Sequence, residues 1–167
     1  MDQMKFALQM ERQGFDYYSK AAQKAANPAA QRMLLSLADD EKKHEKIILE
    51  LMDGKIANID TPPLKGVKNV FQQLVDQNKS FAAEDDLIKV CKEAAQVEKK
   101  SAELYQQLAD QTDNPQQKDI WLTIKKEEEK HLRLLTLTFD YVDEPNMVLE
   151  NAEFLFYGHE EGQEHHG

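Results

Sequence analysis

Two short stretches of this sequence each contain a Glu that is followed three residues later by a His. The first holds Glu41 and His44 in DDEKKHEK, and the second holds Glu128 and His131 in KEEEKHLR. Residues three apart lie on one face of a helix, so each pair can direct a carboxylate and an imidazole at the same point. A lone motif of this kind in a charged helix is usually solvated surface. The rest of the chain must therefore decide between a surface and a metal site.

The chain repeats itself with an offset of 87 residues, the distance from Glu11 to Glu98. Residues 5–50 align without a gap to residues 92–137, and 12 of the 46 pairs are identical. Chance would give roughly one identity in fifteen for an average composition. The matches include polar and turn residues as well as apolar ones: Glu11 and Glu98, Tyr18 and Tyr105, Asn27 and Asn114, Pro28 and Pro115, Glu41 and Glu128, His44 and His131. We interpret this pattern as a duplicated helical hairpin.

Helix signals fall at matching places in the two halves. Asn27 and Asn114 are favoured N-caps, and each is followed by a Pro, which the first helical position tolerates. The sequence predicts helices over about residues 3–24, 28–52, 86–110 and 115–141, with a short amphipathic helix over residues 67–75 in the long connection. These elements predict an all-α four-helix bundle with one long crossover, formed by residues 1–145. Residues 146–167 are expected to form a tail that is packed at first and then flexible.

Each of the four long helices carries a Glu inside its apolar stripe, the face expected to lie in the core. The four are Glu11, Glu41, Glu98 and Glu128, and the two histidines fall on the same stripes. Burying one unpaired carboxylate costs several kcal/mol, and four of them close together also repel one another. Two divalent cations would balance four carboxylates while both histidines stay neutral. Oxygen ligands with one imidazole per metal suit iron or manganese better than structural zinc.

The composition narrows the classes of partner. There are 21 basic and 31 acidic side chains, a net charge of −10, which disfavours nucleic acid as a partner. No apolar run reaches the roughly 20 residues that span a bilayer, and we see no secretion signal, so we expect a cytoplasmic protein with no membrane partner. The one cysteine, Cys91, excludes a disulfide framework and is expected to pack as a small apolar side chain.

The paired E…E-x-x-H pattern resembles that of ferritin-like di-iron proteins, and most of all the rubrerythrin family, over about residues 4–141. The resemblance implies that Glu41 and Glu128 bridge two iron ions, with manganese possible, while Glu11 and Glu98 are terminal ligands. It implies that His44 and His131 each bind one metal. It also implies a reaction with hydrogen peroxide or dioxygen.

Four further residues stand near these six. Tyr18 and Tyr105 lie one heptad after Glu11 and Glu98, where a phenol can donate to a ligating carboxylate or simply pack in the core. Asp40 and Glu127 resemble the acids of the family that accept the second N–H of a ligating histidine; the alternative is that they face solvent.

The chain also departs from the family. Rubrerythrins that act as peroxidases usually carry an additional Glu where this chain has Ser101, and the first-half counterpart of Ser101 is Gly14. The residue that would ligate haem in the similar bacterioferritins is replaced by Lys42, so no haem is expected. With one cysteine there is no rubredoxin iron site, so electrons are expected from an external donor, rubredoxin-like or another reductase.

Three functions remain open at this point. The first is a di-iron oxidoreductase, a peroxidase or oxidase that consumes a small oxidant; we expect it to be a homodimer. The second is a ferroxidase or iron-handling protein of ferritin type. The third is a non-catalytic helical module that binds a partner protein.

Overall fold

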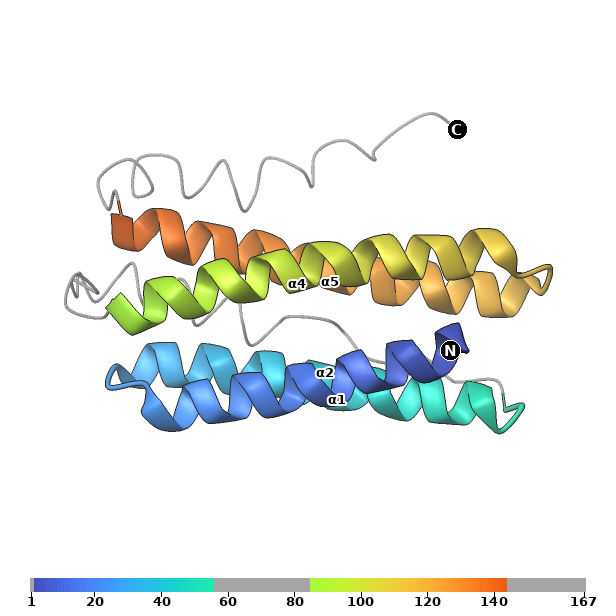
Figure 1. Cartoon of the computed structure of the whole chain (residues 1–167), viewed down its shortest axis with the longest axis horizontal. Helices are drawn as coiled ribbons and strands as arrows, with labels where there is room; N and C mark the ends of the chain where they lie inside the picture. Colours follow the sequence, from blue (N-terminus) through green and yellow to red (C-terminus); the bar gives the residue numbers. More distant parts are fainter. Residues whose placement is uncertain (1, 56–84, 144–167) are drawn as a thin grey trace, which may run out of the picture.

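The computed structural model describes residues 2–55 and 85–143, and within these ranges the chain forms four long helices (Figure 1). They are α1 (Gln3–Lys24), α2 (Pro28–Met52), α4 (Asp85–Gln111) and α5 (Pro115–Asp143). Every boundary lies within two residues of the expected one. The largest difference is at the end of α5, which continues to Asp143, two residues before Pro145. The predicted helix over residues 67–75 and the tail over residues 146–167 lie outside the described residues.

The ends of the helices follow from local chemistry. The side chain of Asn27 accepts hydrogen bonds from two backbone N–H groups in the first turn of α2, at 2.8 and 3.3 Å. Asn114 does the same for α5, at 3.0 and 3.2 Å. After α2 the chain turns at Gly54, whose φ of 72° lies in the left-handed region that glycine adopts without strain. These contacts fix where α2 and α5 begin and where α2 stops.

Two helical hairpins form the bundle. The first pairs α1 with α2, and the second pairs α4 with α5. The hairpins lie against each other with their axes nearly aligned, so that α1 contacts α4 and α2 contacts α5 (Figure 1). This arrangement confirms the predicted all-α bundle of two hairpins.

The core consists of two apolar clusters separated by a polar band. One cluster is built around Met33, Leu37 and Leu135, and the other around Ile48, Trp121 and Ile124. Along α2 and α5, the Glu and His of each motif fall between residues of the two clusters. The helices therefore hold these polar side chains at the middle of the bundle.

Cys91 packs in the first cluster with 1% of its surface exposed. Burial raises the pKa of its thiol to about 12, so the side chain behaves as the apolar residue that was expected. Within residues 2–55 and 85–143, none of the helices is both long enough and apolar enough to cross a bilayer.

Candidate metal centre

The six residues singled out in the sequence converge at the middle of the bundle. Glu11 comes from α1, Glu98 from α4, and each of α2 and α5 supplies a Glu and a His. All six are at most 5% exposed, and His44, Glu128 and His131 are 0% exposed. The expectation that these side chains lie in the core, and not on a solvated face, is confirmed.

Their donor atoms form two sets that overlap. The first set is Glu11, Glu41, His44 and Glu128; the second is Glu41, Glu98, Glu128 and His131. Within each set the donor atoms all lie within 4.8 Å of one another. Because Glu41 and Glu128 belong to both sets, they stand where carboxylates bridging two metals would stand. That these residues bind metal stays a prediction.

The inward-facing imidazole nitrogens lie among carboxylate oxygens without bonding to them. Nδ1 of His44 is 2.9 Å from a Glu128 oxygen and 3.3 Å from a Glu11 oxygen. Nδ1 of His131 is 3.4 Å from a Glu41 oxygen and 3.5 Å from a Glu98 oxygen. Among the described residues, neither nitrogen has a partner in hydrogen-bonding geometry.

Four carboxylate oxygens of the same cluster are also buried without a hydrogen bond, one each on Glu11 and Glu41 and both on Glu128. Such groups are rare inside proteins because each has lost its water without gaining a partner. A shared pair of cations would satisfy all of them, and a donor set of oxygens with one imidazole per metal fits iron or manganese.

The outward-facing nitrogens of both histidines bind acids from the opposite hairpin. Nε2 of His44 bonds to Glu127, and Nε2 of His131 bonds to Asp40 at 3.1 Å. An ionised carboxylate can only accept a hydrogen bond, so in both pairs the histidine Nε2–H donates. That fixes one proton on Nε2 and directs Nδ1 into the cluster, where its lone pair is available to a metal once Nδ1 has released its own proton. Asp40 and Glu127 thus contact the histidines and do not face solvent.

Both tyrosines donate to a carboxylate of the cluster, again across the two hairpins. Tyr18 on α1 donates to Glu98 on α4, and Tyr105 on α4 donates to Glu11 on α1. Each phenol holds one carboxylate oxygen, which limits the directions in which the other oxygen can point.

Burial and crowding make the cluster retain protons when no cation is present. Burial raises the pKa of Glu128 to about 8, helped by the charges of Glu98 and Glu11, and burial and neighbouring acids also raise the pKa of Glu41. Burial alone would lower the pKa of both histidines, but the surrounding carboxylates outweigh it and raise both. Protons and metal ions therefore compete for the same atoms.

A glycine that sequence reasoning treated only as the counterpart of Ser101 proves to touch the cluster. A Cβ added at Gly14 would lie 2.6 Å from Oε2 of Glu41. The absence of a side chain at this position lets α1 pass close to that carboxylate. The sequence does contain a signal for this contact: Gly14 lies in the interior of a predicted helix, where glycine lowers helix stability and gives no local benefit.

Comparison with known proteins adds one finding. The family model described as Rubrerythrin matches residues 2–138 of this chain. Neither the curated proteins nor the solved structures gave a match.

Proposed function

This chain belongs to the rubrerythrin family, and we propose that it is a di-iron oxidoreductase that reacts with hydrogen peroxide or dioxygen, using electrons from an external donor. The observation that carries the proposal is the pair of overlapping donor sets, which share Glu41 and Glu128 at the centre of the bundle. Four carboxylates balance the charge of two divalent ions, and the family supports iron as the metal.

The chemistry that bound iron would supply is two electrons, one per ion, and two electrons with two protons convert one hydrogen peroxide into two waters. The protein's own part is to hold the ligands. Asp40 and Glu127 keep the Nε2 protons in place, and Tyr18 and Tyr105 each hold one carboxylate. Such contacts limit the directions in which the imidazoles and carboxylates can point, which keeps them aimed at the shared centre.

An external donor is part of the proposal because these 167 residues contain a single cysteine and cannot form a four-cysteine iron site. Ser101 on α4, 6% exposed, stands where peroxidases of the family carry an extra Glu. The experiment below therefore compares oxidation by peroxide with oxidation by dioxygen.

The decisive experiment loads the protein with Fe(II) without oxygen, measures bound iron, and then follows oxidation by peroxide in a stopped-flow spectrometer. We expect about two irons per chain and one peroxide consumed per two irons. Glu128→Gln should reduce the bound iron, because it removes a carboxylate shared by both sets. Glu129→Gln, at the exposed neighbouring position, is the control and should behave as the wild type.

Two results would count against the proposal. If the wild-type chain binds neither iron nor manganese, the non-catalytic helical module that binds a partner protein becomes the favoured function. The ferritin-type alternative would be favoured by two results together. Bound iron would be oxidised much faster by dioxygen than by peroxide, and the protein would elute from gel filtration as a shell-sized particle and not as the homodimer that we propose.

A further inference from the structure

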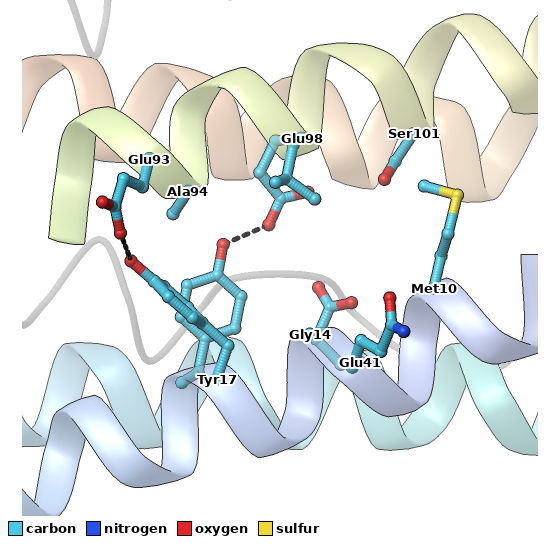
Figure 2. Close-up of a pocket in the computed structure, with 11 residues that line it drawn as sticks. Met10, Gly14, Tyr17, Glu41, Glu93, Ala94, Glu98 and Ser101 are labelled. Carbon is cyan, nitrogen blue, oxygen red and sulfur yellow. Dashed lines mark hydrogen bonds between the residues drawn. The ribbon is translucent and has the colours of Figure 1, made fainter.

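A cavity of about 170 Å³ lies between α1 and α4, next to the candidate metal centre (Figure 2). Its wall includes Glu41 and Glu98, which both belong to the donor set of His131. Glu11 and His44, which belong only to the other set, are not part of the wall. The cavity therefore leads to one of the two candidate metal positions.

Side chains from both helices close the two ends of the cavity (Figure 2). At one end, the hydroxyl of Tyr17 donates to Glu93 at 3.0 Å, and the neighbouring Tyr18 donates to Glu98. At the other end, Met10 extends from α1 toward α4. The cavity is thus limited at its two ends along the helices, while its outer side, where Val97 is 51% exposed, opens to solvent.

Two small residues keep the space open. Gly14 contributes no side chain, and a Cβ there would already collide with Glu41. Ser101 is 6% exposed, and its hydroxyl points into the cavity (Figure 2). Within residues 2–55 and 85–143 this hydroxyl makes no hydrogen bond to another side chain or to the backbone, so it is available to a bound molecule. Because its oxygen is not among the fully buried atoms that lack a partner, it is accessible from the cavity, and a ligand there can bond to the Ser101 hydroxyl in place of water.

The size of the cavity exceeds what a small oxidant needs. One water takes up about 30 Å³ in the liquid, whereas an apolar cavity of roughly 150 Å³ binds benzene. Met10, Ala94 and Val97 give the wall an apolar surface. None of the lining residues is a Lys, Arg or His, so the wall offers no positive side chain to an anion.

We propose that this cavity binds a small uncharged organic molecule of about the size of phenol. Its polar group bonds to the Ser101 hydroxyl, and its apolar body lies against Met10 and Val97, beside Glu41 and Glu98. The centre would then take an organic ligand in addition to its oxidant. The inference depends on the proposed function only for the metals that neutralise the two carboxylates.

Phenol and benzene serve as matched probes, because they differ by one hydroxyl. Binding to the full-length protein is measured by ligand-observed NMR: saturation transfer in the metal-free form, and relaxation of the ligand protons after loading with paramagnetic Mn(II). We expect saturable phenol binding, with relaxation that is faster in the loaded form because the probe lies near the metal. Metal content of every sample is measured separately.

Two substitutions of Ser101 distinguish the effect of its hydroxyl group on binding from the effect of the cavity volume. Ser101→Ala should weaken phenol binding by about 2- to 10-fold, the value of one hydrogen bond, and leave benzene binding unchanged. Ser101→Leu should abolish binding of both probes by filling the cavity. Gln107→Leu adds the same side chain at an exposed position of α4 and should bind like the wild type.

The proposal is overturned if the wild type shows no saturable phenol binding, or if Ser101→Leu binds phenol as well as the wild type does. It is also overturned if Ser101→Ala weakens the binding of phenol and of benzene equally, since the Ser101 hydroxyl would then not be the group that binds the phenol hydroxyl. A protein that binds no metal but binds phenol in this pattern would refute the proposed function and leave the cavity assignment standing.

Discussion

At the scale of single residues, the centre depends on contacts that set the direction of each ligand. His131 donates from Nε2 to Asp40, which in turn is 3.2 Å from the ammonium group of Lys43. Burial would raise the pKa of Asp40, but His131 and Lys43 outweigh it and hold that pKa below its usual value. Asp40 therefore stays ionised near neutral pH and can keep the His131 proton on Nε2.

Asp40→Ala should weaken metal binding by about 10- to 100-fold, the usual effect of removing an acceptor behind a ligating histidine. The physical reason is that the free ring can rotate and can carry its proton on Nδ1. Affinity is measured by competition with a chromophoric chelator. The control is Asp39→Ala, which removes an exposed acid one residue away. Equal affinities for the two variants would show that Asp40 does not position His131.

At the scale of elements, the apolar face of each helix that packs in the core also carries residues of the polar cluster. In α1, a glycine lies in the interior of the helix: Gly14 lies between Glu11 and Tyr18 and faces the Glu41 carboxylate of α2. Glycine inside a helix costs about 1 kcal/mol relative to alanine. The helix is thus less stable than it could be at the position where α1 leaves room for the Glu41 carboxylate.

Gly14→Ala should change stability and metal binding in opposite directions. In the metal-free protein, the helix gains up to about 1 kcal/mol in propensity, and the flexible end of Glu41 can move away from the new Cβ. Metal affinity should fall, because Glu41 is displaced from a position shared by both donor sets. Urea unfolding of the metal-free form and chelator competition measure the two quantities. Unchanged affinity would show that the contact does not constrain Glu41.

At the scale of the whole molecule, two apolar clusters stabilise the bundle and the band of charged ligands between them destabilises it. A ligand that binds only the folded state adds stability according to its concentration and affinity. Metal binding should therefore stabilise the folded protein as well as supply its chemistry.

The metal-free protein should lose stability as the pH rises from 6 to 9. The folded pKa values of Glu41, Glu128 and both histidines are raised above their unfolded values, for Glu128 to about 8. The folded state then holds more protons than the unfolded state, so its advantage is present at low pH and is lost as the pH rises through the folded pKa. The slope should be on the order of 1 kcal/mol per pH unit for each such proton.

Urea denaturation at a series of pH values, after treatment with a chelator, measures this dependence. Glu98 acts in the opposite sense, because its pKa is lowered to about 2, but its contribution changes only below about pH 4.5. The metal-loaded protein is the control, and it should not show the loss, because metal has replaced the protons. A metal-free protein that becomes more stable from pH 6 to pH 9 would show that the folded state does not hold these extra protons.

The sequence by itself determined the elements and the membership of the cluster of candidate ligands. Asn27-Pro28 and Asn114-Pro115 marked helix starts because capping involves only neighbouring residues. The six candidate ligands could be found because helical periodicity and the 87-residue repeat place each of them on an apolar stripe. Both signals are local or repeated, so they can be read without knowing how the hairpins pack.

Only the tertiary structure decided which residues pair. Asp40 accepts a hydrogen bond from His131, and Glu127 accepts one from His44, in each case across the two hairpins. The two tyrosines also donate to acids of the opposite hairpin. Partners 80 to 94 residues apart in sequence depend on the rotation and offset of one hairpin against the other. The cavity beside Ser101 arises in the same way, because it lies between α1 and α4 and is a property of neither helix alone.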